Sequence, residues 1–288
     1  MKAVGPKLHL IERSYWPEFW PRLRAASIAL HKDGCFGTAK GIAYSGLLSF
    51  FPMLTTIAAI LVQAKAEALS RTVVHLLFDV VPPGSEEVVR RLFVVHGERP
   101  GWLLVGATLL ALFAASGAMM SLMEGFRAVY RIPHGRTFLK ERVVAILLAL
   151  TSALPVIGAS ALIVFGHRSE RAIIQWMGMS AEGRGWVLLA GQAVRFVVAS
   201  GSIVLATALV YYWGPNRKQE LRKVFPGAIL ATFLWLLATL GFAWYVRHVA
   251  NYNVMYGSVG AGLALLVWMY VLAIIVLLGC EFNAAPKT

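Results

Sequence analysis

The side chain best placed to do chemistry is the guanidinium of Arg195, which lies inside a long apolar run at 187–210. A charge within a membrane span costs at least about 2.5 kcal/mol and usually has a function. On a helix, Gln192 and Ser202 would share its face with several small residues, so this face would look into a bundle or a cavity. A guanidinium there can hold a phosphate or carboxylate through two hydrogen bonds. The alternative, of equal weight, is an arginine that extends to the outer head groups.

Three other polar residues are candidates for the same binding role. Tyr44 lies beside a face of small residues in the first apolar run, and Asn251 and Asn253 fill the short turn before the last run. Aromatic residues at such positions are also typical anchors at the membrane surface. The expected topology has no acidic residue at the depth of Arg195, which favours an external anion as its partner. The predicted substrate-binding group is therefore Arg195, Gln192, Ser202, Tyr44, Asn251 and Asn253.

Small residues and prolines mark expected packing points or hinges. In the first run, Gly41, Ser45 and Ser49 recur at every fourth position and would share one helix face, where small side chains let helices pack closely in lipid. Pro52 follows and should kink the helix. Gly257 and Gly260 begin the last run and predict close packing there. Pro226 is expected in the first turn of the fifth helix, where proline is normal.

Sequence motifs of well-known enzymes are absent. The chain has no Gly-rich phosphate loop, no His-x-Glu or His-Glu-x-x-His metal pattern and no Gly-x-Ser-x-Gly elbow. Two-metal nuclease chemistry needs clustered carboxylates, yet no two acids expected on the basic face lie within three residues of each other. We predict no catalytic residue, no metal and no cofactor, and an enzyme is the less favoured class.

The composition indicates where these residues are held. The chain is 58% hydrophobic and 14% charged, whereas soluble domains have about 25% charged residues. A span needs about 20 apolar residues, and such spans are helices because lipid leaves no backbone group unpaired. We predict an all-α polytopic bundle of six transmembrane helices plus short interfacial helices, one of them at Trp16–His31. The predicted spans are 39–62, 101–123, 143–166, 187–210, 225–246 and 259–282.

The basic residues set the expected orientation. Seventeen Lys and Arg residues fall on the side of both termini and nine on the other side, and the side richer in Lys and Arg is cytoplasmic. We expect a cytoplasmic segment at 1–38, a membrane domain at 39–284 and both termini inside the cell. Cys35 and Cys280 would then lie on the reducing side, where a disulfide is unfavourable.

The net charge of +13 suggests partners. Each surface Lys or Arg contributes about 1 kcal/mol of attraction to anionic lipid head groups. Nucleic acid is the rival partner for such a charge, but it is not favoured here. The expected partners are membrane lipids with anionic head groups, and a homo-oligomer is an open alternative.

Several segments together resemble the YihY / virulence factor BrkB family, long called ribonuclease BN. The resemblance covers residues from about 20 to 284 and depends on the order and spacing of its segments. These are Ala43-Tyr44, Ser49–Leu54, Ser116–Ser121, Phe126–Tyr130, Tyr211–Asn216, Phe225–Ala228, Tyr256–Ser258, Trp268–Tyr270 and Leu278–Asn283. Many members have Asn where this chain has Arg127, so a role for that Asn is not carried over.

The resemblance implies a six-helix inner-membrane protein with a transport, envelope or lipid-related role and no established catalytic residues. The tRNA-processing activity under the old name fits soluble zinc hydrolases with a His-x-His-x-Asp-His motif, which this chain lacks. The favoured hypothesis is a transporter or lipid-handling protein in which Arg195 recognises an anionic group. A membrane-bound ribonuclease and a structural envelope protein without turnover are the alternatives.

Overall fold

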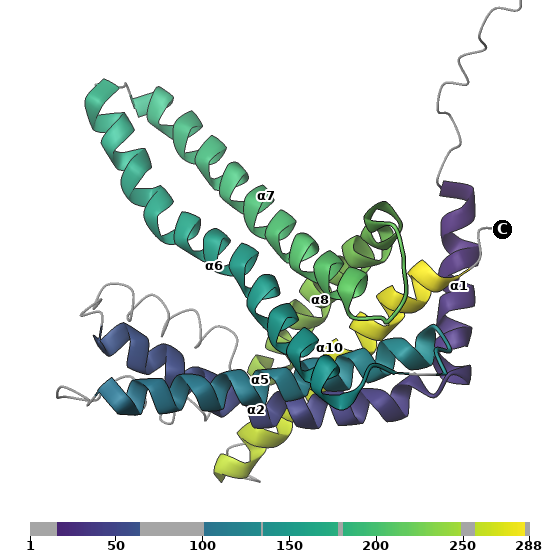
Figure 1. Ribbon diagram of the computed structural model, residues 1–288. Coiled ribbons are helices and arrows are strands. Elements are labelled where there is room, and N and C mark those ends of the chain that lie inside the picture. Colours follow the sequence, from purple (N-terminus) through teal and green to yellow (C-terminus); the bar gives the residue numbers. More distant parts are fainter. Residues whose placement is uncertain (1–15, 64–100, 134, 178–180, 249–256, 286–288) are drawn as a thin grey trace, which may run out of the picture.

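The computed structural model describes residues 16–63, 101–133, 135–177, 181–248 and 257–285 (Figure 1). All regular structure in these ranges is helical, so the all-α class is confirmed. The helices are α1 (Trp16–Lys32), α2 (Cys35–Gln63), α5 (Gly101–Val129), α6 (Phe138–Met177), α7 (Ala181–Trp213), α8 (Leu221–His248) and α10 (Gly257–Ala284).

Several of these helices are long and apolar enough to cross a membrane. Five such stretches occur in the described residues: Val105–Val129, Phe138–Ala159, Leu188–Trp213, Leu221–Tyr245 and Gly262–Ala284. The expected first span, 39–62, lies within α2, whose side chains are described only as far as Thr56. A multi-pass helical membrane protein is therefore confirmed, while the count of six spans stays a prediction.

The helices are arranged as pairs that diverge from a common end. The most extensive contacts join α2 to α5 and α6 to α7, and α10 packs against both α2 and α8. Figure 1 shows the α6–α7 pair leaving the junction in a different direction from the α2–α5 pair. The junction lies where α2, α6 and α8 begin and where α5, α7 and α10 end.

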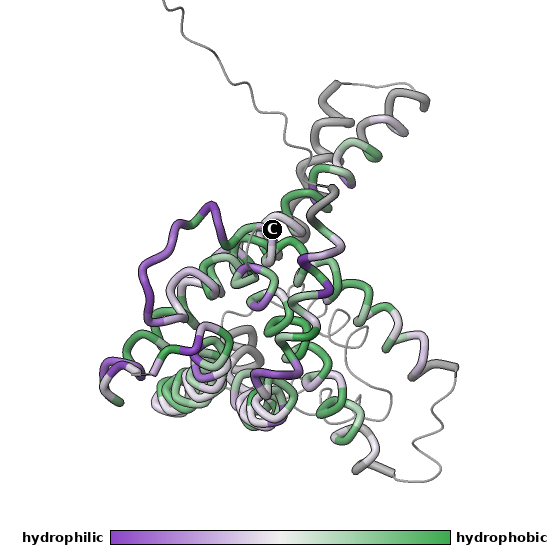
Figure 2. The backbone as a smooth tube through the Cα atoms, turned by 90° about the vertical axis from the view of Figure 1, so that its right-hand side faces the viewer, coloured by the Kyte–Doolittle hydropathy of each residue, from purple (hydrophilic) through white to green (hydrophobic). Residues whose placement is uncertain are grey.

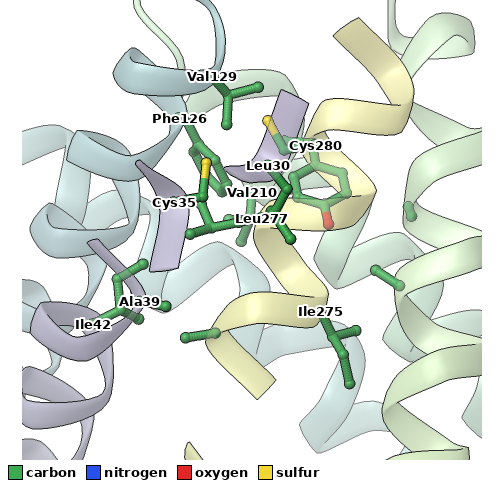
Figure 3. Close-up of a cluster of buried hydrophobic side chains, with 14 of the residues drawn as sticks. Leu30, Cys35, Ala39, Ile42, Phe126, Val129, Val210, Ile275, Leu277 and Cys280 are labelled. Atoms are coloured by element: carbon green, nitrogen blue, oxygen red, sulfur yellow. The ribbon is translucent and has the colours of Figure 1, made fainter. Parts of the chain in front are cut away.

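The main hydrophobic core lies at this junction (Figure 3). It is built from the first turns of α2, the last turns of α5 and α7, the start of α8 and the C-terminal half of α10. Away from it, large side chains such as Leu109, Leu154 and Trp244 are exposed, as expected for helix faces that meet lipid. Figure 2 shows hydrophilic colour mainly in connecting segments and short stretches of helix, with the other described helices pale or hydrophobic.

The N-terminal helix belongs to the same end of the molecule. The helix predicted at Trp16–His31 is confirmed as α1, and it packs on the last turns of α10. The Arg22 guanidinium donates to the Phe282 carbonyl at 3.3 Å and stacks over its ring, 4.9 Å from the centroid. Ala26 is buried with Phe282 and Leu230 in a second small core.

The expected small-residue face of α2 is only partly used for packing. The hydroxyls of Ser45 and Ser121 share a 2.8 Å hydrogen bond that joins α2 to α5. Ser49 is buried and donates to the Gly46 carbonyl at 2.8 Å. Gly41 is exposed, and no atom lies within 4 Å of where a Cβ would stand. Within the described chain, close packing on this face therefore starts at Ser45 and does not include Gly41.

The structure shows where the predicted hinge proline and the residues predicted to begin the last two spans lie in their helices. Pro52 lies inside α2, which continues helically to Gln63. α10 begins at Gly257, and Gly260 is buried in its first turn. The placement of Pro226 in a first turn is wrong, because α8 begins at Leu221. The helix starts before the predicted span because Leu221 and the basic residues Arg222 and Lys223 also adopt helical geometry.

A close helix contact joins α8 to α10 through two glycines. A Cβ on Gly279 would lie 2.7 Å from the Gly227 carbonyl oxygen, 2.5 Å from Tyr211 Oη and 2.8 Å from Ala231 Cβ. Two of these obstacles are backbone or a short side chain, so they cannot move aside. Glycine at this site lets the two backbones touch, as is common between membrane helices.

We expect Gly279→Ala to destabilise the folded protein by about 1–3 kcal/mol, the usual cost of forcing extra atoms into a packed core. The measurement is the thermal unfolding midpoint of the detergent-purified chain. Gly241→Ala on α8 is the matched control, because nothing lies within 4 Å of its Cβ position and alanine favours helix over glycine. Equal midpoints for the two variants would contradict the close α8–α10 contact.

Candidate functional site

The described members of the predicted anion-binding group have different surroundings. Arg195 is partly buried on α7 and interacts within the chain, so the expectation of an unpaired arginine is wrong. A buried guanidinium without a partner is costly, which is the physical reason for this difference. Ser202 donates its hydroxyl to the Val198 carbonyl of its own helix at 2.8 Å, and Gln192 is exposed.

The other members of the predicted group lie elsewhere. Tyr44 is 60% exposed on α2, so its ring faces outward from the described helices. Asn251 and Asn253 lie outside the described residues. Of this predicted group, the structure therefore describes only Arg195, Gln192 and Ser202 on α7 and Tyr44 on α2.

A buried polar cluster occupies the junction instead. Glu281 on α10 is 3% exposed, and its Oε1 accepts a hydrogen bond from the Cys35 thiol at 3.6 Å. Cys280 is fully buried beside it, next to the Tyr130 side chain. Figure 3 shows Cys35, Phe126 and Cys280 converging from three helices. Residues separated by 246 positions thus meet in one place.

The cysteines of this cluster are not built for nucleophilic chemistry. Cys35 lies just before the expected first span, and burial raises the pKa of its thiol to about 12, with a further contribution from the Glu281 carboxyl. Cys280 is likewise a free, buried cysteine. Because the thiolate is the reactive form, a thiol held protonated is inert. The two cysteines therefore serve packing and hydrogen bonding, not catalysis.

Two arginines cover the cluster on the side of the basic loops. The Arg217 guanidinium lies over the Tyr130 ring, 4.4 Å from its centroid. Arg131, in the turn after α5, has a positive φ of 51° and donates to Asp33 at 3.0 Å. Burial raises the pKa of the Tyr130 phenol well above its ordinary value, so its hydroxyl stays neutral. In the sequence, Arg131 and Arg217 contributed only to the predicted orientation in the membrane. In the structure they also contact Asp33 and the Tyr130 ring.

The connection between α5 and α6 is fixed by two more arginines. Arg127 makes hydrogen bonds to both carboxylate oxygens of Glu141, at 2.8 and 3.0 Å. Arg136 donates to the carbonyls of Trp213 and Gly214, at 3.1 Å each. Its partial burial lowers the pKa of the guanidinium below its ordinary value, but an arginine stays charged. The carbonyl of Trp213, the last residue of α7, has no partner within the helix and is satisfied in this way.

A third polar link joins α10 to the start of α8. The Asn283 amide accepts from the Gly227 N–H at 2.8 Å and donates to the Val224 carbonyl at 3.0 Å. The sequence pointed to these residues only through motif resemblance, because a partner 56 residues away leaves no local pattern. The side chain therefore holds the first turns of α8 against α10.

The side chains of this buried polar cluster hold the helices together at the junction. Among the described residues, no group of three or more His, Cys, Asp or Glu side chains is arranged to hold a metal ion. Arg195 lies on the same helix as Ala208 of the main hydrophobic core, 13 residues earlier. At 1.5 Å per residue this is about 20 Å along α7, so the two regions are separate.

Comparison with known proteins gives a consistent family. The model of the family described as virulence factor BrkB matches residues 27–288. The ribonuclease-like protein YfkH of Bacillus subtilis is 30% identical over 246 residues, which cover 84% of this chain and 86% of the relative. No solved structure matches the chain.

Other relatives are named only as membrane proteins. The UPF0761 membrane protein of Alkalilimnicola ehrlichii is 30% identical over 88% of this chain, which spans 55% of that relative's length. A UPF0761 membrane protein of Alteromonas mediterranea is 27% identical over 88% of this chain and 83% of its own length.

We expect both cysteines to resist alkylation in the folded protein at pH 7–9 and to react once the chain is unfolded. The pKa of Cys35 is raised from 9.0 to about 12, so the fold favours the protonated thiol. Its contribution to stability is complete below pH 9 and is lost as the pH rises towards 12. Mass spectrometry after iodoacetamide treatment measures this, and rapid modification of the native protein at pH 8 would contradict it.

We expect Arg127→Gln to lower the free energy of unfolding by about 2 kcal/mol, because it leaves the buried Glu141 carboxylate without its charged donor. A double variant with Glu141→Gln should lose less than the sum of the single changes. Lys223→Gln is the control: the Lys223–Glu220 pair is 61% and 69% exposed, and such a pair contributes at most about 1 kcal/mol. Chemical denaturation in detergent measures all four. Additive losses would show that Arg127 and Glu141 do not interact.

Proposed function

This chain belongs to the virulence factor BrkB family, and we propose that it binds and moves an anionic amphiphile, most simply a membrane lipid. In this proposal it spans the cell inner membrane six times, with both termini in the cytoplasm. Neither a catalytic residue nor a cofactor is assigned.

The observation that carries the proposal is the unequal packing of the two ends of the bundle. The main core joins the helices at the basic end, while the α2–α5 and α6–α7 pairs diverge from it (Figure 1). A bundle closed at one end and spread at the other gives lipid access to its inner faces from the opposite side of the membrane. This arrangement suits a ligand that enters sideways from the bilayer.

The position of Arg195 supports an anionic group on that ligand. It lies on α7 about 20 Å from the core, at 1.5 Å per residue, among residues that include the exposed Val194, Phe196 and Val197. A partly buried cation in an apolar setting favours a phosphate or carboxylate, which can accept two parallel hydrogen bonds. During binding, Arg195 would exchange its interaction within the chain for one with the ligand.

Interior prolines offer the bending points that movement requires. Pro52 lies inside α2 and Pro155 lies inside α6, so each diverging pair contains one helix with a missing backbone hydrogen bond. Kinks in long helices occur at such residues. We propose that the pairs move about these prolines while the junction stays closed.

The test is lipid retention by the detergent-purified full chain. Lipids extracted from wild-type protein should include anionic species at about tenfold higher occupancy than in Arg195→Ala, the loss expected for one charge-assisted contact. Arg195→Lys should fall between them, since lysine keeps the charge but not the planar fork.

Lys223→Ala removes an exposed cation at the basic end and should leave retention unchanged. Protein yield reports folding in every variant. The proposal fails if Arg195→Ala, at normal yield, keeps its anionic lipid.

A second candidate function is ribonuclease activity, favoured by the similarity to YfkH, a relative named as ribonuclease-like. The basic loops would hold the RNA in that case. Cleavage of labelled RNA by the purified chain, lost after heat unfolding, would support this candidate over lipid handling.

A further inference from the structure

An open cavity of about 680 Å³ lies where the loop before α6 meets the loop after α7. One part of its lining is polar and basic: Arg136, Thr137, Lys140 and Asn216. The other part is apolar and comes from the first turns of α6, at Leu139, Val143 and Val144. The cavity therefore has cationic groups next to an apolar surface.

The cationic part is built on fixed side chains. Arg136 is held by its two hydrogen bonds to the carbonyls of Trp213 and Gly214. Gly135 lies directly against the Arg127 guanidinium, which is itself bound to both oxygens of Glu141. That carboxylate is thus neutralised by Arg127 and does not oppose an anion. The lining keeps a net positive charge from Arg136 and Lys140.

Several polar groups of the cavity are available to a ligand. Lys140 and Thr137 are exposed, and within the described residues neither side chain makes a hydrogen bond or ion pair. Glu141 N–H donates to the Thr137 carbonyl at 2.9 Å, so α6 begins directly after Thr137. The amides of that first turn have no acceptor within the helix and favour a phosphate beside them.

The apolar part lies at the start of a membrane-crossing stretch. Phe138–Ala159 is apolar enough to span a bilayer, and Leu139 is 72% exposed. The cationic groups therefore stand at the level of lipid head groups, and Leu139 and Val143 continue towards the acyl chains. A soluble anion would contact the cationic part of the lining and gain nothing from the apolar part.

We propose that this cavity binds an anionic phospholipid of the leaflet on the basic side, with its phosphate at Arg136 and Lys140 and one acyl chain along Leu139 and Val143. The site is separate from Arg195, so neither assignment depends on the other. It would anchor the α5–α6 connection and the end of α7 to the same lipid molecule, next to the closed end of the bundle.

The test uses the full chain in nanodiscs that contain phosphatidylglycerol with a photoreactive head group. Illumination and mass spectrometry should map the crosslink to the peptide that contains residues 135–144. Lys140→Gln should reduce labelling there about tenfold, the effect of losing one charge-assisted contact, and Lys140→Arg should largely restore it. Lys223→Gln, an exposed cation elsewhere on the basic side, and Arg195→Ala should leave this crosslink unchanged.

Competition identifies the source of the phosphate. Unlabelled phosphatidylglycerol should suppress the crosslink, whereas glycerol 3-phosphate and phosphatidylcholine should not. Leu139→Ser should weaken labelling, since it removes part of the apolar wall. The proposal is overturned if Lys140→Gln labels like wild type, if the crosslink maps elsewhere, or if glycerol 3-phosphate competes as well as the lipid.

Discussion

The closed end of the bundle depends on α8 and α10 approaching each other backbone to backbone at Gly227 and Gly279. In lipid, helices gain no hydrophobic energy by touching, so association relies on close van der Waals contact and interhelical hydrogen bonds. Both are present here. Tyr211 Oη donates to the Val276 carbonyl at 2.6 Å and ties α7 to the same stretch of α10, while Asn283 ties α10 to α8. Next to this contact, α7 packs on α8, and α1, α2 and α5 pack on α10.

The same contact explains the division of the molecule into a closed and a spread end. Small residues and polar links at the junction hold the helices together. Further along, the α6–α7 pair carries mainly exposed apolar side chains such as Leu154 and Phe196. These faces meet lipid without cost, so no strong force draws the diverging pairs together.

The arginines at the basic end have a structural duty beyond their charge. Arg127, Arg131, Arg136 and Arg217 each engage a carboxylate, a carbonyl or an aromatic ring. The hydrogen bonds of Arg127 and Arg131 hold carboxylates, whereas those of Arg136 satisfy carbonyls at and just after the end of α7. Lys140 differs, since it stands exposed at a cavity that also has an apolar wall. All of these residues are cationic, so their charge does not distinguish a structural role from a binding role. The contacts that each side chain makes do distinguish them.

The sequence by itself determined the helical class, the membrane setting and the approximate place of each long helix, because an apolar run of span length must satisfy its backbone internally. It also indicated that Arg195 stands within such a run. Only the tertiary structure decided which side chains meet. Cys35 and Glu281 are 246 positions apart, and Arg127 and Glu141 lie on different helices. Such pairs depend on the rotation and crossing of whole helices, which hydropathy leaves open. For the same reason, Gly41 matched the small-residue pattern yet stayed exposed, whereas Gly279 forms the tightest contact between α8 and α10.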